Sequence, residues 1–270
     1  VGSNIDAAIN QLIYRNNRSL NMRSHVAGGP NGVLKSVPSN ATNHDPVVAW
    51  RPAVQFISLR NPGEFIFEWN EFRNEFGNSS CSDTVSMIDC RGTAAKRLVQ
   101  RDNWIDGSYP VYNFNPNNPS QRMGWSGGGM MVEGSNSEYV DRINNMAIAC
   151  TNYGFSIWAA QNDCLASGNR YVSAGRTPDN TRLTAANVGL VCTTSNGRFE
   201  NNFSRNMFDN NGNSVIRNDW YLPNGTHSGN TNSPAGTVTL ADEAAERDLW
   251  IAKKRAAGRY MGSPWVSWPY

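Results

Sequence analysis

Residues 47–69 read VVAWRPAVQFISLRNPGEFIFEW, and this stretch is the strongest indication of fold in the chain. Two runs rich in β-branched, aromatic and aliphatic residues, 47–59 and 64–69, are separated by the turn signal Asn61-Pro62-Gly63. Large aromatic side chains recur at every second position of the second run, which places them on one face of a strand. The stretch therefore predicts a β-hairpin, two antiparallel strands joined by a turn.

Helical spacing of apolar residues predicts two helices before the C-terminal region. In residues 4–20 the apolar residues fall on one helical face, and Ser3 and Asp6 form a capping pair at the start. Residues 137–153 show the same spacing, and Gly154 is a natural stop. We therefore expect an N-terminal and a central amphipathic helix.

A third helix, over residues 240–257, has signals at both ends. Thr239 and Asp242 form its capping pair, and basic residues at 253–255 complement the negative end of the helix dipole. Gly258 ends it. An aromatic tail follows, in which Trp265, Trp268 and Tyr270 are candidate ligand-binding residues.

The rest of the body, residues 46–240, consists of short strand-like runs between Asn- and Gly-rich loops. Among these runs are 84–88, 155–160, 170–174 and 188–193. We recognise no internal repeat, and strands and helices do not alternate regularly, so a parallel sheet is not expected. The sequence predicts an α+β fold: an antiparallel sheet with N-terminal, central and C-terminal helices and long Asn/Gly-rich loops. Because composition shows no sharp boundary, residues 1–270 are predicted to form a single domain.

Charge and motifs exclude several classes of function. The chain has 24 basic and 22 acidic residues, a net charge of +2, which gives no reason to expect a nucleic-acid partner. No apolar run is long enough to span a bilayer. There is no P-loop, GxGxxG or HExxH motif, and His25, His44 and His227 are isolated from one another and from cysteine. We therefore expect no cofactor.

The five cysteines suggest an oxidising compartment. Cys81 and Cys90 bracket a short segment that a disulfide would close, and we predict that bridge. One further bridge among Cys150, Cys164 and Cys192 would leave one thiol, and the sequence does not decide which. The pattern favours an extracellular, cell-surface or virion-surface protein; the alternative is five reduced cysteines in a cytosolic protein.

One string resembles a catalytic motif. Gly124-Trp125-Ser126-Gly127-Gly128 fits the G-x-S-x-G pattern, in which a strained turn exposes a serine nucleophile. The motif requires a buried strand before the serine, whereas residues 117–122 are polar and turn-forming. Asp209 or Asp219, together with His227, would have to complete a triad, and nothing selects them. A glycine-rich turn is the favoured interpretation, with Ser126 as a weak catalytic candidate.

Two further groups of oxygen ligands are candidates. Four glutamates, Glu64, Glu68, Glu71 and Glu75, would suit glycoside hydrolysis, but their spacing fits a solvated face better. Asp209, Asn211 and Asn213 alternate as in a calcium loop, but the EF-hand register fails and a polar turn is favoured.

No complete catalytic constellation emerges, so the leading hypothesis is a non-catalytic extracellular or particle-surface protein that acts by self-assembly or ligand binding. An N-terminal helix ahead of a disulfide-bearing sheet is also the layout of pilin-like subunits; a viral structural protein is the other example. The expected partners are further copies of the chain or other surface proteins. The alternatives are a secreted serine hydrolase using Ser126 and a glycan-binding protein.

Overall fold

The structure is a computed structural model, and it describes residues 3–6, 11–21, 57–60, 64–75, 81, 83–109, 127–134, 136–158, 163–176, 188–192, 196–206, 220–221, 225–232 and 237–259. In this part of the chain the strands form three sheets of seven strands each, and every strand pair is parallel. A single helix, α1 (Leu240–Ala256), accompanies them within these residues.

Each sheet takes every third strand of the chain. Sheet A contains β1 (Ser3–Asp6), β4 (Ile57–Arg60), β7 (Asp83–Ile88), β10 (Gly128–Glu133), β13 (Tyr153–Ile157), β16 (Val188–Cys192) and β19 (Trp220–Tyr221). Sheet B contains β2 (Gln11–Arg15), β5 (Glu64–Glu68), β8 (Leu98–Arg101), β11 (Val140–Ile143), β14 (Cys164–Ser167), β17 (Gly197–Glu200) and β20 (Thr226–Ser228). Sheet C contains β3 (Arg18–Leu20), β6 (Glu71–Arg73), β9 (Trp104–Ser108), β12 (Met146–Cys150), β15 (Arg170–Ser173), β18 (Phe203–Asn206) and β21 (Thr231–Asn232).

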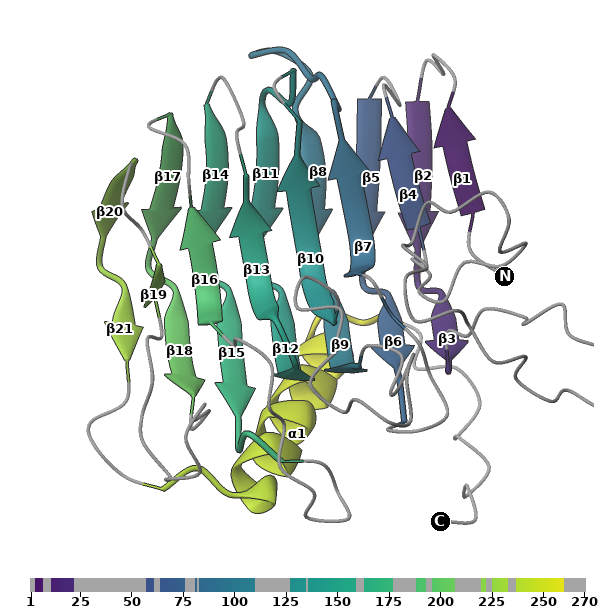
Figure 1. Ribbon diagram of the computed structural model, residues 1–270. Helices are drawn as coiled ribbons and strands as arrows, with labels where there is room; N and C mark the ends of the chain where they lie inside the picture. Colours follow the sequence, from purple (N-terminus) through teal and green to yellow (C-terminus); the bar gives the residue numbers. More distant parts are fainter. Residues whose placement is uncertain are drawn as a thin grey trace, which may run out of the picture.

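The chain therefore winds through sheets A, B and C in turn and then begins the next coil on top of the last. Seven such coils stack into a parallel β-helix, with the first coil at one end and the last at the other (Figure 1). This is a solenoid architecture, in which each coil contacts mainly its neighbours.

The predicted α+β fold with an antiparallel sheet is wrong. Strands β4 and β5, expected to pair as a hairpin, lie in different sheets and form successive sides of one coil. Within the described residues, three strands, β1, β2 and β3, occupy the predicted N-terminal helix at 4–20. The central helix predicted at 137–153 is replaced by β11, β12 and the start of β13.

A tight turn between sheets B and C explains why the helices do not form. In every coil the residue before this turn's asparagine has a left-handed backbone, as in Asn16 (φ 58°) and Asn144 (φ 54°). Asn and Gly adopt that conformation readily, whereas a helix interior excludes it. The Asn-Asn pairs at 16–17 and 144–145 thus end one strand and redirect the chain into the next.

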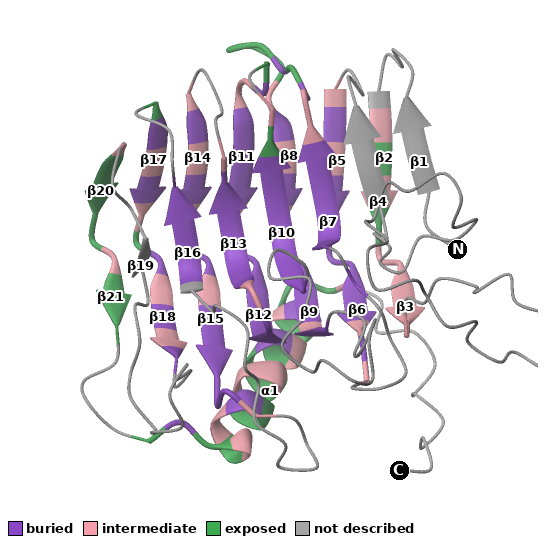
Figure 2. Cartoon of the chain, viewed as in Figure 1, coloured by how far each residue is buried: buried purple, intermediate pink, exposed green. Residues whose placement is uncertain are grey.

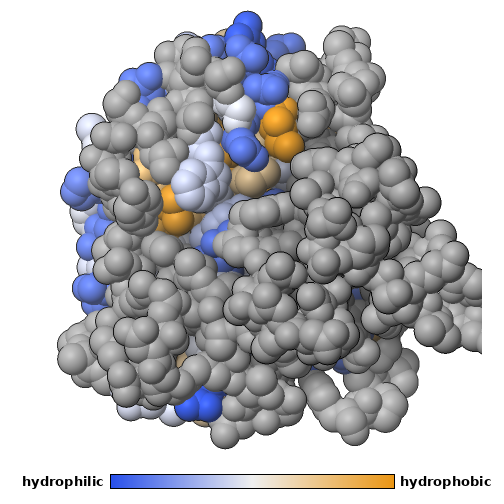
Figure 3. Space-filling view, viewed as in Figure 1, coloured by the Kyte–Doolittle hydropathy of each residue, from blue (hydrophilic) through white to orange (hydrophobic). Residues whose placement is uncertain are grey.

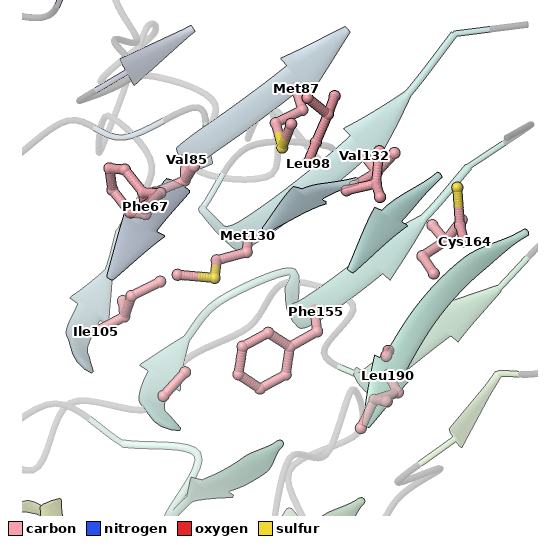
Figure 4. Close-up of a cluster of buried hydrophobic side chains, with 14 of the residues drawn as sticks. Phe67, Val85, Met87, Leu98, Ile105, Met130, Val132, Phe155, Cys164 and Leu190 are labelled. Carbon is pink, nitrogen blue, oxygen red and sulfur yellow. The ribbon is translucent and has the colours of Figure 1, made fainter. Parts of the chain in front are cut away.

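The interior of the coils is a continuous hydrophobic core. Its side chains come from all three sheets and are fully buried, and they include those labelled in Figure 4 such as Phe67, Met130, Phe155 and Leu190. Buried positions run through the middle coils, and exposed positions gather at the last coil, β20 and β21 (Figure 2). Inward aromatic and aliphatic residues from successive coils therefore stack along the axis of the solenoid.

Helix α1 is the predicted helix that the structure contains. Thr239 and Asp242 form the expected capping box, and basic residues occupy the last turn. The helix packs on the outer face of sheet C, where Trp250 stacks on Trp104 with ring centroids 6.1 Å apart. Seventeen helical residues span about 25 Å, the depth of roughly five coils at about 4.8 Å each. One helix therefore covers most of the apolar outer surface of sheet C.

All five cysteines are free thiols and all are buried. Cys81 and Cys90 lie before and after strand β7, whose six extended residues separate them by far more than a disulfide can bridge. The predicted Cys81–Cys90 bridge is therefore incompatible with this fold. Cys150, Cys164 and Cys192 belong to the hydrophobic core instead.

Candidate assembly interface

A ladder of asparagines runs the length of the solenoid. It has one member per coil, at the turn between sheets B and C: Asn17, Asn70, Asn103, Asn145, Asn169, Asn202 and Asn230. Each of the first six donates its backbone N–H and its Nδ2 to the Oδ1 of the next, at 2.8–3.0 Å. The second Nδ2 hydrogen of each member after the first goes to a backbone carbonyl of the preceding coil.

In the middle coils, the buried amide groups of the ladder make all of their hydrogen bonds. Asn103, for example, is fully buried, accepts two hydrogen bonds and donates two. Buried amide groups that make all their hydrogen bonds fix one register, because a slip by one residue would leave them unpaired. The ladder therefore specifies how one coil sits on the next.

The ladder has a direction, and its two ends differ chemically. At the first coil, no described residue donates to the Oδ1 of Asn17, whose own N–H and Nδ2 are used. At the last coil, Asn230 accepts from Asn202 and donates to the carbonyl of Phe199. Its backbone N–H and one Nδ2 hydrogen have no acceptor among the described residues. One end thus presents an acceptor and the other presents donors.

Among the described strands, those at the two ends of each sheet have a neighbour on one edge only. All residues of β20 and β21 are exposed, and the edge of the molecule where they lie is hydrophilic (left in Figure 3). On β2, at the other end, Ile13 is 47% exposed, and the partly buried Tyr14 stacks on Phe67. Exposed edge strands are templates for pairing with another chain.

Continuing the ladder gives the register in which a second copy would stack. Phe199 lies three residues before Asn202 and pairs with His227, three residues before Asn230. The same offset from Asn17 in a second copy puts its Tyr14 opposite His227. Likewise its Ile13 lies opposite Thr226, and its Arg15 lies opposite Ser228. No facing pair on these two strands carries like charges.

The glutamates expected on a solvated face form ion pairs along the stack instead. Glu68 is fully buried between Arg15 and Arg101, one on each neighbouring coil. Burial acts to raise the pKa of Glu68, but the hydrogen bonds and charges of the two arginines outweigh it and leave the pKa below its ordinary value. Such a carboxylate stays ionised, which does not suit the general acid of a glycosidase.

The neighbouring glutamates have similar structural partners. Glu71 is buried and pairs with Arg18 at 2.8 Å, and Glu75 accepts from Asn21 at 2.7 Å. Glu68 and Glu71 are therefore buried in contacts between coils, and not on the solvated face that their spacing favoured.

Several candidates from the sequence lie outside the described residues. They are the weak catalytic candidate Ser126, the weak metal candidates Asp209, Asn211 and Asn213, and the aromatic tail Trp265, Trp268 and Tyr270. Their proposed roles stay predictions. His227 is described and lies on the exposed edge strand β20.

The described residues were also considered as metal ligands and as membrane-spanning segments. Over the described ranges, no cluster of three His, Cys, Asp or Glu residues is placed to hold a metal ion. Helix α1 and the rest of the described chain offer no helix with the length and apolar character needed to cross a membrane.

The chain was compared with protein-family models, curated proteins and solved structures. It matches none of them. The ends of the solenoid are the feature of the described structure that points to a function.

The ladder asparagines were not identified from the sequence, although they share a local sequence pattern. Each follows Asn, Asp, Gly or Trp in a left-handed conformation and stands between two short strands. The abundance of Asn was assigned to loops, whereas seven of these residues hold the core of the stack together.

Proposed function

We propose that the protein is a non-catalytic structural subunit that acts by self-assembly, with copies stacked head to tail along the solenoid axis. The observation that carries the proposal is the polarity of the asparagine ladder, which begins with the acceptor Oδ1 of Asn17 and ends with the donors of Asn230. Each end supplies what the other lacks, and the edge strands on either side of the ladder are in register for parallel pairing.

Head-to-tail contact has a geometric consequence. The two surfaces in contact are different, so each added copy leaves the same free ends and the assembly grows as an open filament. Seven coils at the ordinary strand spacing of about 4.8 Å add about 34 Å of filament per copy. The expected location at a cell or particle surface rested partly on a disulfide, so the proposal concerns assembly alone.

The position of Ser228 provides a test at one residue. Ser228 is exposed on β20, so substitutions there leave the core untouched. In the stack it faces Arg15 of the next copy, whose side chain is 37% exposed. Ser228→Arg places two cations opposite one another and weakens assembly, Ser228→Glu places opposite charges there and strengthens it, and Ser228→Gln is the neutral control.

The measurement is mass photometry over a concentration series, with electron microscopy of the concentrated protein. We expect filaments with axial repeats of about 4.8 Å and about 34 Å. The critical concentration should rise in the order Ser228→Glu, Ser228→Gln, Ser228→Arg. A protein that stays monomeric at high concentration, or three variants with equal critical concentrations, would contradict the proposal.

A further inference from the structure

An arginine lies inside the hydrophobic core of the solenoid. Arg142, on β11, is 1% exposed, and its side chain occupies an inward row of sheet B. The paired residues of that row are Phe67, Gln100, Arg142, Ala166 and Phe199. All of them except the arginine are neutral, so a guanidinium is placed where the fold otherwise puts apolar or amide side chains.

The contacts of Arg142 are all to neutral groups. Its Nε donates to the Oε1 of Gln100 at 2.9 Å, and its Nη1 donates to the carbonyls of Met130 at 2.9 Å and Ser156 at 2.8 Å. The side chain thus reaches across the interior from sheet B to sheet A. Two of the buried donors that have no acceptor in the part of the chain described belong to this pair of side chains: Nη2 of Arg142 and Nε2 of Gln100.

No carboxylate compensates this charge among the described residues. The acidic groups whose charges would act on the guanidinium are Tyr153 and Cys164. Burial raises the pKa of Cys164 to about 11 and the pKa of Tyr153 well above its usual value, so both are neutral at pH 7. Burial also lowers the pKa of Arg142 to about 9, which still leaves it charged at neutral pH. An unpaired buried cation costs several kcal/mol, so a counter-ion would be strongly favoured.

The unpartnered donors define the chemistry of that counter-ion. Nε and Nη2 lie on the same side of the guanidinium fork, and Nε donates to the Gln100 amide that also carries the free Nε2. A water molecule between Nη2 and Nε2 would accept from both but would need acceptors for its own hydrogens. An anion needs none and supplies the missing charge.

We propose that a small monovalent anion, chloride under ordinary conditions, is enclosed in the core of the solenoid and accepts hydrogen bonds from Nη2 of Arg142 and Nε2 of Gln100. The anion is bound as the coils close around it. It stabilises the folded chain because the unfolded chain has no such site.

The first test is the chloride dependence of stability. Urea unfolding is followed while sodium chloride replaces sodium gluconate, an anion too large for the core, at constant ionic strength. Above the dissociation constant, each tenfold increase in chloride should raise the folding equilibrium constant tenfold, equivalent to about 1.4 kcal/mol. Crystals grown from protein refolded in bromide should give an anomalous scattering peak within hydrogen-bond distance of Nη2.

A pair of variants separates this site from general salt effects. Gln100→Glu supplies a carboxylate to the guanidinium fork, so it should abolish the chloride dependence and raise the unfolding midpoint in gluconate. Arg198→Met is the control, because Arg198 lies on the outer face of the same sheet. Its partner Asp163 is still paired with Arg97 when the Arg198 charge is removed. It should retain the full dependence.

Three results would overturn the proposal: equal stability of the wild-type protein in chloride and gluconate, an undiminished chloride dependence in Gln100→Glu, or no bromide peak beside Arg142. The first and third are measured on the wild-type chain, so they decide the matter even if the variant does not fold.

Discussion

Glu243 should make the docking of helix α1 depend on pH. Its side chain is buried between the helix and sheet C and accepts a hydrogen bond from the backbone N–H of Ala174 at 2.7 Å. Burial raises the pKa of Glu243 from 4.5 to about 8, and the charges of Asp106 and Asp242 act in the same direction. The folded protein therefore holds a proton that the unfolded chain has released.

The direction and size of the effect follow from proton linkage. A carboxyl group whose pKa is raised by folding stabilises the protein fully below its unfolded pKa, and that contribution is lost as pH rises toward the folded pKa. For values of 4.5 and about 8, the loss between pH 5 and pH 8 is about 3 to 4 kcal/mol. Relaxation of the helix around the ionised group would reduce this figure, so it is an upper limit.

The assay is urea unfolding at pH 5, 6, 7 and 8, with the fluorescence of the stacked pair Trp104 and Trp250 reporting helix docking. Glu243→Gln keeps the acceptor for Ala174 and cannot ionise. It should match the wild-type stability at pH 5 and exceed it by up to about 3 to 4 kcal/mol at pH 8.

Glu246→Gln is the matched control on the same helix. Glu246 pairs with Arg170 at 2.6 Å, so its loss costs an ion pair but leaves Glu243 in place, and the decline in stability toward pH 8 should persist. If Glu243→Gln declined with pH as steeply as the wild-type protein, the buried carboxyl would not be its source.

Two further substitutions test the ladder and the helix cap. Asn103→Ala removes four buried hydrogen bonds and should lower the free energy of unfolding by about 4 kcal/mol, whereas the exposed control Asn136→Ala should have little effect. Equal urea midpoints for these two variants would show that the hydrogen bonds of the asparagine ladder do not stabilise the fold. Thr239→Ala removes the capping box of α1 and should cost about 1 kcal/mol, while Thr237→Ala, outside the helix, should cost almost nothing. Hydrogen exchange in the first turn of α1 reports the loss, and unchanged exchange would count against the cap.

The parts of the fold that sequence could predict are those specified by nearby residues. Strands were expected at 84–88, 155–160, 170–174 and 188–193, and β7, β13, β15 and β16 occupy these places, with bounds that differ by at most three residues. The C-terminal helix has its cap and charges within its own 17 residues. Local patterns thus located elements but carried no information about which strand pairs with which.

The coil repeat escaped detection because its length is not constant. Successive ladder asparagines are 53, 33, 42, 24, 33 and 28 residues apart, since insertions of different length separate the coils. A repeat can be detected in a sequence only if its spacing is fixed. The structure requires only that each coil bring its asparagine to the turn between sheets B and C. The repeated feature is a left-handed residue followed by Asn, a pattern that many turns share.

The central helix was predicted for a related reason. In residues 137–153 the inward-facing residues of β11 and β12 are offset by the turn at 144–145, and the interruption happens to reproduce helical spacing. Strand β12, MAIAC, is buried on both faces, by the core on one side and by the cluster under α1 on the other. A strand covered on both sides loses the alternation of apolar and polar residues that would identify it.

The basic end of α1 has a function in the fold that its own sequence could not indicate. Lysines there suit the helix dipole, yet Lys254 is buried and its Nζ donates to the carbonyl of Trp69 at 3.1 Å. Lys253 donates to the carbonyl of Asn144 at 3.0 Å, and Trp250 donates to that of Asp102 at 2.9 Å.

These three acceptors are the left-handed residues at the turns of three consecutive coils. The three side chains lie within five residues of one helix, and the two lysines are long enough to reach the turns on either side of the one that Trp250 contacts. The helix thereby ties together the turns that carry the asparagine ladder. We infer that its last two turns fix the spacing of the coils from outside, as the ladder does from within.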